Sequence, residues 1–126
     1  MKNNKGFTLV EIIVVLLIMS ILAAMAAPAI TGYIEDSNNS TYLAMGKSVL
    51  KYSQVEAAKL ASDNPGFSDG DLQVAINNRL TKEELEINII GVTTDPNKHV
   101  KTFEFTISGK IVKYDSTNSP TIWIAN

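Results

Sequence analysis

The stretch GFTLVEIIVVLLIMSIL, residues 6–22, is almost entirely apolar and carries a single charged side chain, Glu11. Between residues 7 and 27 the only other polar side chains are Thr8 and Ser20. As an α-helix, residues 7–27 would be about 32 Å long, which is enough to cross the hydrocarbon core of a bilayer. A carboxylate in such a helix is unfavourable by about 2.5–3.5 kcal/mol near the centre and by less near an end. Glu11 therefore needs either a partner for its charge or a position near the end of the helix, where the energy of burying that charge is smaller.

The composition divides the chain of 126 residues in two. After Thr31 the sequence becomes polar and mixed, so we expect a hydrophobic helix followed by one small globular part. The formal net charge is −2 and the lysines are scattered, so no basic stripe indicates nucleic acid binding. The chain has no cysteine, which excludes a disulfide framework, a zinc-finger ligand set and a thiol nucleophile.

The charges around the apolar run predict its orientation in a membrane. Lys2 and Lys5 precede the run, and no basic residue follows until Lys47, so the N-terminus should stay in the cytosol. Three interpretations compete: an ordinary signal peptide cut near the alanines of residues 23–27, a plain membrane anchor, and a short leader whose removal leaves the helix on the mature chain. The residues at the start of the run favour the third.

The run Lys5-Gly6-Phe7-Thr8-Leu9-Val10-Glu11, followed by the apolar residues 12–27 and Pro28, resembles the N-terminus of the type IV pilin and pseudopilin family. This resemblance covers about the first 30 residues. It implies that a prepilin peptidase/methyltransferase cuts between Gly6 and Phe7 and methylates the new Phe7 amine. It also implies three parts: a leader (1–6), a transmembrane and filament-core helix (7–32) and a globular pilin-like domain (33–126).

The spacing around the cleavage point has a physical logic of its own. Gly6 has no side chain, so the scissile backbone is unhindered. Glu11 lies one helical turn after Phe7, near the helix N-terminus, where the helix dipole favours its charge. Cleavage would create a free Phe7 amine, and we expect Glu11 to form a salt bridge with that amine, in its own subunit or in a neighbour. With a neighbour, the salt bridge would set the axial register of a helix bundle. The alternative is that Glu11 reaches back to a lipid headgroup.

Pro28 and Gly32 disturb the helical pattern, since proline removes one backbone hydrogen bond and glycine weakens a helix. Either they end the membrane helix, or they mark a kink that can lose helical structure when subunits pack. The resemblance favours the second interpretation. A further poor helix-forming segment, Asp36–Thr41, predicts a loosened turn.

The globular part predicts an α+β fold: the long helix packs on a four-stranded antiparallel sheet. Apolar residues at spacings of three, four and seven continue a helix from Tyr33 to about Ser62, with a core-facing side made of Leu43, Met45, Val49, Leu50, Tyr52, Ala57, Ala58 and Ala61. A loop over 63–70 and a short helix over Asp71–Leu80 follow. Thr81-Lys82-Glu83-Glu84 has the pattern of a capping box opening one more turn.

Four runs then predict a β-meander: Glu86–Val92, Val100–Ser108, Lys110–Tyr114 and Thr121–Ala125. Asp95–Lys98 and Ser108-Gly109 predict the turns between the first three strands. The sheet should pack one apolar face on the helix, through Phe103, Phe105, Ile107, Ile122 and Ile124. Trp123 alternates with the last two and should point outward.

No constellation of residues predicts catalysis or a cofactor. His99, the only histidine, lies in a predicted turn and has no nucleophile partner pattern. The carboxylates Asp63, Asp69 and Asp71 do not have the spacing of an EF-hand, so no metal site is predicted. A membrane-anchored enzyme is therefore disfavoured.

Taken with the resemblance, these features predict a precursor of a structural subunit of a type IV pilus, a surface filament for adhesion, twitching or gliding motility, or DNA uptake. The subunit would wait in the cytoplasmic membrane, and a cytosolic ATPase and a platform protein in that membrane would then build it into an extracellular helical homopolymer. One alternative is a pseudopilin of a type II secretion or competence system. The lack of cysteine disfavours pilins of Gram-negative type, which often close a C-terminal loop with a disulfide. A third hypothesis is that the chain is a secreted binding protein, cut near Ala27.

Overall fold

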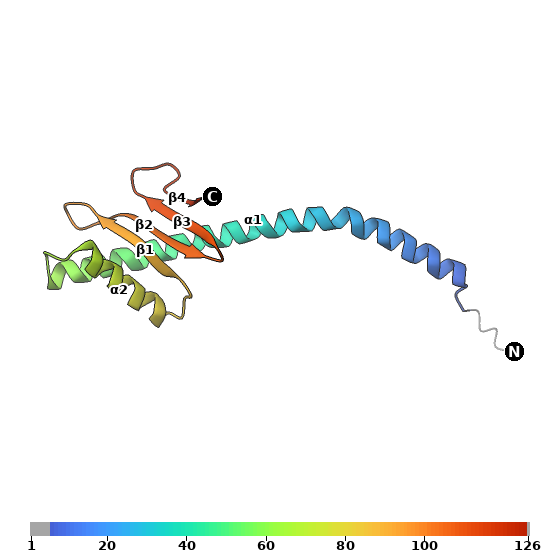
Figure 1. Cartoon of the computed structure of the whole chain (residues 1–126), viewed down its shortest axis with the longest axis horizontal. Helices are drawn as coiled ribbons and strands as arrows, with labels where there is room; N and C mark the ends of the chain where they lie inside the picture. Colours follow the sequence, from blue (N-terminus) through green and yellow to red (C-terminus); the bar gives the residue numbers. More distant parts are fainter. Residues whose placement is uncertain (1–5, 126) are drawn as a thin grey trace. The chain divides into compact units, whose positions relative to one another are not determined.

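The computed structural model describes residues 6–125, so the predicted roles of Lys2 and Lys5 lie outside the described residues. The elements run in the order α1 (Leu9–Asp63), α2 (Asp69–Lys82), β1 (Asn88–Thr94), β2 (Val100–Ile107), β3 (Lys110–Asp115) and β4 (Ile122–Ala125) (Figure 1). The chain divides within α1 into two compact units, Met1–Asn38 and Asn39–Asn126, which are described separately below.

Helix α1 is continuous over 55 residues, with Pro28 inside it. The alternative in which Pro28 and Gly32 end the helix is therefore wrong, and so is the predicted loosened turn at Asp36–Thr41. A proline removes only one hydrogen bond of the helix, and low intrinsic propensity is a weak preference that neighbouring turns override. Whether the helix melts around Pro28 in a filament stays a prediction.

In the second unit, α1 buries one narrow face. The buried residues are Gly46, Val49, Ser53 and Ala57, at the three- and four-residue spacing of a single helical stripe. This confirms the predicted core positions Val49 and Ala57, whereas Ala58 is exposed and its prediction was wrong. Gly46 and Ser53 were not predicted because small and polar side chains carry little apolar signal. The missing side chain of Gly46 lets β3 and β4 lie close to the helix there.

The four strands form an antiparallel meander in the order β1-β2-β3-β4, as predicted. The β2–β3 turn has Ser108 at φ 49° and Gly109 at φ 78°, the left-handed conformations of a two-residue hairpin. In the β1–β2 turn, the Lys98 N–H donates to the Asp95 carbonyl at 2.9 Å. Strand β1 begins two residues later than predicted because α2 and the turn after it extend further along the chain.

The inner face of the sheet forms the core with α1 and α2. Phe103, Phe105, Val112 and Tyr114 are buried there, together with Phe67, Leu72, Ile76 and Leu80. The Phe103 ring stacks on the Tyr114 ring at a centroid distance of 5.0 Å. Ile107, Ile122 and Ile124 are partly buried against this cluster, so the predicted inward face of the sheet is confirmed.

The capping box of this unit lies at the start of α2 rather than at Thr81–Glu84, where the sequence predicted it. The Asp71 N–H donates to the Ser68 hydroxyl oxygen at 3.2 Å, and the Ser68 N–H donates to the Asp71 carboxylate at 2.9 Å. Thr81 is instead near the end of α2, where its hydroxyl donates to the Asn77 carbonyl at 2.9 Å. A Thr-x-x-Glu pattern does not by itself say whether a helix begins or ends there.

Side chains of α2 cover the outer edge of β1. Gln73 donates to the Ile89 carbonyl at 3.1 Å, and the Asn77 side-chain oxygen accepts from the Ile89 N–H at 2.8 Å. Near the other end of β1, Asp69 accepts from the Thr94 N–H at 3.0 Å. These backbone groups are therefore unavailable for pairing with a strand of another molecule.

Candidate processing and assembly site

Gly6, Phe7 and Thr8 lie outside regular structure, directly before α1. Phe7 is 85% exposed, and a Cβ added to Gly6 would meet nothing within 4 Å. The Gly6–Phe7 peptide bond therefore lies in exposed, non-helical backbone, the kind of segment that a peptidase can bind in an active site.

Glu11 and Thr8 form a reciprocal cap at the start of α1. The Thr8 N–H donates to the Glu11 carboxylate at 3.0 Å, and the Glu11 N–H donates to the Thr8 hydroxyl oxygen at 3.2 Å. The first helical hydrogen bond runs from the Ile12 N–H to the Thr8 carbonyl at 3.2 Å, which makes Thr8 the N-cap residue. The sequence reasoning missed this cap, although Thr8-x-x-Glu11 directly before an apolar run is its usual signal.

The cap changes the interpretation of Glu11. The carboxylate already has a partner before any cleavage, which offsets part of the unfavourable energy of its charge near lipid. Its place in the first turn is also where the helix dipole favours an anion. A capping glutamine could make the same hydrogen bonds, however, so the cap alone does not explain the negative charge.

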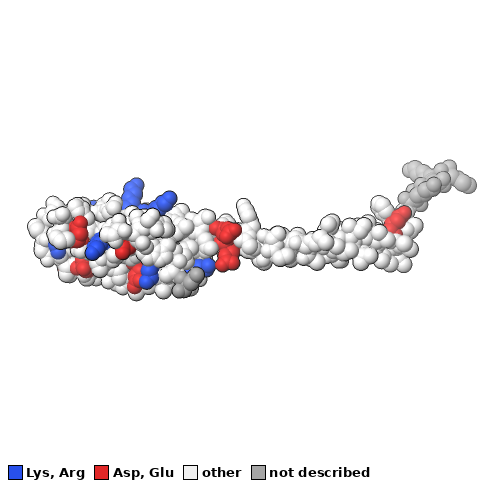
Figure 2. All heavy atoms as spheres, turned by 90° about the horizontal axis from the view of Figure 1, so that it is seen from above, with Lys and Arg blue, Asp and Glu red and all other residues white. Residues whose placement is uncertain are grey.

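The first half of α1 exposes a continuous apolar surface. Large apolar side chains are exposed along it, among them Leu9 at 77%, Leu17 at 60% and Met25 at 70%. Within the described residues, α1 is the one helix long and apolar enough to cross a membrane, and none of its most apolar stretch is buried. Figure 2 shows this half as a long uncharged surface with acidic atoms near its start. Such a surface needs lipid or other protein to cover it.

Each of the polar side chains in this apolar half is satisfied by nearby backbone. Besides the Thr8–Glu11 cap, the Ser20 hydroxyl donates to the Leu16 carbonyl at 2.6 Å, and the Thr31 hydroxyl donates to the Pro28 carbonyl at 2.9 Å. Backbone bonding of this kind lets hydroxyl side chains enter an apolar environment without an unpaired donor.

Nothing in the described chain explains why residue 32 is glycine. A Cβ there would meet no atom within 4 Å, and the backbone is helical. Since glycine is unfavourable by about 0.8–1.0 kcal/mol in a helix relative to alanine, Gly32 weakens α1 without a compensating contact inside the chain. Together with Pro28 it makes the local part of α1 the segment with the weakest helical preference.

His99, Asp69 and Asp71 are engaged in structural contacts. His99 is exposed and lies 3.3 Å from the Asp95 carboxylate, in the β1–β2 turn. Asp69 and Asp71 bond to backbone at β1 and at the start of α2. Among residues 6–125, no three His, Cys, Asp or Glu side chains are grouped so as to hold a metal ion.

Comparison with known proteins connects this N-terminal arrangement to a family. The model of the prokaryotic N-terminal methylation motif matches residues 1–27, which contain the Gly6–Phe7 junction and Glu11. The type IV major alpha-pilin of Moraxella bovis is 38% identical over 87 residues, covering 67% of this chain and 52% of the relative. Fimbrial protein Q of Moraxella bovis is 34% identical over 97 residues, covering 77% of this chain and 56% of the relative. The methylation motif and these two relatives together support the assignment of the chain to the type IV pilin family.

The chain spans about half the length of these curated pilins. No solved structure matches it significantly. The features of this chain that support a pilin are the methylation motif, the exposed apolar helix and the α+β arrangement of a long N-terminal helix on a four-stranded antiparallel sheet.

Proposed function

We propose that this chain is the precursor of a structural subunit of a type IV pilus. The exposed apolar half of α1 is the observation that carries the proposal, because it is far larger than a folded soluble domain leaves uncovered. In the membrane, lipid would cover it. In a filament, the equivalent helices of other subunits would cover it instead, so one surface would serve as anchor and then as filament core.

In this proposal the leader 1–6 is removed between Gly6 and Phe7, and the new Phe7 amine is methylated by the same membrane enzyme. The exposed, non-helical backbone on both sides of this bond supports that position for the cut. The Glu11 carboxylate then has two classes of donor available, the Thr8 N–H that it already binds and a cationic amine one helical turn away. If Glu11 releases the Thr8 N–H and binds the Phe7 amine of a neighbouring subunit instead, that salt bridge would set the axial register of the filament.

The proposed partners follow from this cycle. They are further copies of the chain, the prepilin peptidase/methyltransferase, a cytosolic ATPase and a membrane platform protein. The chain would be held in the cytoplasmic membrane with its N-terminus inside before assembly and would lie in an extracellular filament afterwards. Such a subunit would have no catalytic activity of its own, in keeping with the structural family that the comparisons support.

Mass spectrometry of the mature N-terminus tests the processing step. Protein purified from membranes should begin at Phe7 and carry one additional methyl group. A chain that begins near Pro28 would instead support cleavage by an ordinary signal peptidase and release as a secreted binding protein.

The pseudopilin alternative uses the same processing and the same helix. Both relatives above are named as pilus proteins, an alpha-pilin and a fimbrial protein, which favours the pilus. Electron microscopy of cells at native expression separates the two functions: a pilin should appear in long surface filaments, whereas a pseudopilin should not.

A further inference from the structure

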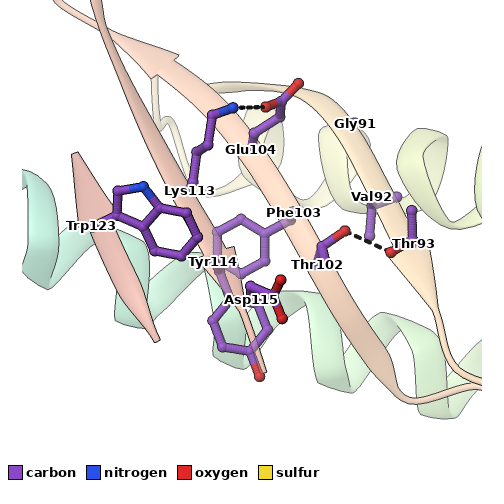
Figure 3. A pocket seen from close by; sticks show the side chains of 10 residues that line it. All are labelled: Gly91, Val92, Thr93, Thr102, Phe103, Glu104, Lys113, Tyr114, Asp115 and Trp123. Carbon is purple, nitrogen blue, oxygen red and sulfur yellow. Dashed lines mark hydrogen bonds and ion pairs between the residues drawn. The ribbon is translucent and has the colours of Figure 1, made fainter. Parts of the chain in front are cut away.

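The sheet has a hollow of about 360 Å³ on the face opposite its buried core (Figure 3). Cross-strand register sets two rows of outward residues side by side in its lining. The first row is Gly91, Glu104, Lys113 and Trp123, and the second is Thr93, Thr102 and Asp115. The hollow thus spans all four strands, and its volume lies within the range of small-molecule sites.

Because Gly91 has no side chain, the first row is open at its β1 end, and this opening is part of the hollow. It lies next to the irregularity in β1 between Ile89 and Gly91, but its φ is not in the left-handed region. A Cβ added there would meet only the Glu104 side chain, at 3.8 Å, an ordinary contact distance. Neither backbone conformation nor core packing therefore requires glycine here. A glycine inside a strand is unfavourable, and it often marks a place where a ligand approaches closely.

The polar groups of the hollow already have partners, either across the hollow or beside it. The Lys113 ammonium lies 3.2 Å from the Glu104 carboxylate, and the Thr93 and Thr102 hydroxyl oxygens are 2.6 Å apart. Asp115 accepts from the Thr117 N–H at 2.8 Å. Two carboxylates and one ammonium give no excess positive charge to hold an anion, and the polar rows do not suit a purely apolar ligand.

Trp123 adds an aromatic wall to these donors and acceptors. Its indole is only partly buried, and Figure 3 shows it beside Lys113 at the β4 end of the hollow. An aromatic face attracts positively polarised C–H groups. A pyranose ring has such C–H groups on its faces and hydroxyl groups around its rim, so it can contact an indole and use neighbouring carboxylate, ammonium and hydroxyl groups as hydrogen-bond partners.

We propose that this hollow binds a neutral saccharide. One pyranose ring lies against the Trp123 indole, and its hydroxyl groups bond to Glu104 and Lys113 over the space that Gly91 leaves open. The proposal concerns the surface of the globular unit and does not rest on the proposed function.

Trp123 is the only tryptophan of the chain, so its fluorescence reports on the hollow directly. The full chain in phosphocholine detergent micelles, which carry no sugar, is titrated separately with the neutral sugars lactose, maltose and N,N′-diacetylchitobiose. At least one of them should shift the Trp123 emission saturably. Amide resonances of the two rows in the NMR spectrum should move over the same concentration range.

Gly91→Val fills the space and should weaken the apparent affinity at least about tenfold, a loss of roughly 1.4 kcal/mol. Thr106→Val is the matched control, because Thr106 is an exposed β2 residue one row away, opposite Ile111 and outside the hollow. It should bind as the parent does. Glu104→Gln, of nearly the same shape, is a second variant that should also weaken binding at least about tenfold, independently of any effect of valine on β1.

The proposal is overturned if none of the three sugars gives a saturable change in either measurement. It is also overturned if Gly91→Val and Glu104→Gln both bind with the parent's affinity, since a sugar would then bind elsewhere. Urea unfolding should show that the parent and each variant are fully folded under the binding conditions, so that a loss of affinity reports on the hollow.

Discussion

At Gly46, α1 and the sheet lie too close together to leave room for a Cβ at an ordinary contact distance, and Gly46→Ala tests that packing. A Cβ on residue 46 would lie 2.9 Å from the Ile122 Cγ2 atom and 3.3 Å from the Val112 Cγ1 atom. Carbon atoms in favourable contact are about 3.5–4.0 Å apart, so β4 would have to move away from α1. Overpacking of this kind usually costs about 1–3 kcal/mol.

The helix itself gains from the substitution, because alanine is favoured over glycine by about 0.8–1.0 kcal/mol in a helix interior. The two effects together predict a net destabilisation of about 1 kcal/mol, within a range of about 0–2 kcal/mol. Ile122→Ala removes the obstructing methyl group, so the double variant should lose less stability than the sum of the two single variants.

Urea unfolding of the full chain in phosphocholine micelles measures these changes, with the fluorescence of Trp123, the neighbour of Ile122, as the signal. Ser48→Ala, on the exposed side of the same helix, is the control and should stay within about 0.5 kcal/mol of the parent. The reasoning is refuted if Gly46→Ala stabilises the unit by about 1 kcal/mol, the gain expected from helix preference without any obstruction.

The remaining predictions concern two structural contacts and the assembly site. Asn77→Ala removes the side-chain oxygen that accepts from the Ile89 N–H at the edge of β1, and it should lower the free energy of unfolding by about 1–3 kcal/mol in the same urea assay. Its control, Asn78→Ala on the exposed face of α2, should change the free energy of unfolding by less than about 0.5 kcal/mol. Hydrogen bonds from the Ser68 backbone and hydroxyl lower the pKa of Asp71 below its ordinary value of 3.8. This contribution to stability is therefore complete above about pH 4 and is lost as the pH falls through the lowered pKa, so Asp71→Asn should show a weaker loss of stability between pH 5 and pH 2 than the parent. Glu11→Gln keeps a capping oxygen but loses the charge, so it should be cleaved and enter the membrane like the parent but form few filaments. Normal filament yield from Glu11→Gln would mean that the cap, not a salt bridge, explains the glutamate.

The sequence predicted the helix-and-sheet architecture because its signals are periodic. Phe103, Phe105 and Ile107 alternate with polar residues, and the turn residues Ser108-Gly109 separate two such runs. These patterns depend on a few neighbouring residues, so they can be recognised without knowing what packs against them.

The errors arose where packing or longer range context decides the structure. Gly46 is buried because Val112 of β3 and Ile122 of β4 lie close to α1, and apolar periodicity does not reveal a buried glycine or serine. The seven-residue spacing of Gly46 and Ser53 on the buried stripe was the one usable signal. The capping pattern at Thr81 could not be separated from the one at Ser68 without knowing where α2 begins. Pro28 did not end α1 because a continuous helix tolerates the loss of a single hydrogen bond.

The candidate site was predicted in part. Gly6, Phe7 and Glu11 form a pattern that is nearly complete within seven residues, and the methylation-motif match covers it. The Thr8–Glu11 cap was missed because the partners expected for the carboxylate were the Phe7 amine and a lipid headgroup, and not the backbone of Thr8. The hollow beside Trp123 depends on residues from four strands, and only the sheet register brings them together.

The central claim is that the exposed apolar half of α1 becomes the core of a filament after cleavage at Gly6. The most direct test is electron microscopy of filaments sheared from the cell surface, combined with N-terminal mass spectrometry of the protein in them. The claim predicts filaments whose subunits begin with N-methylated Phe7. It is contradicted if the chain is absent from such filaments and is recovered from the medium with an N-terminus near Pro28.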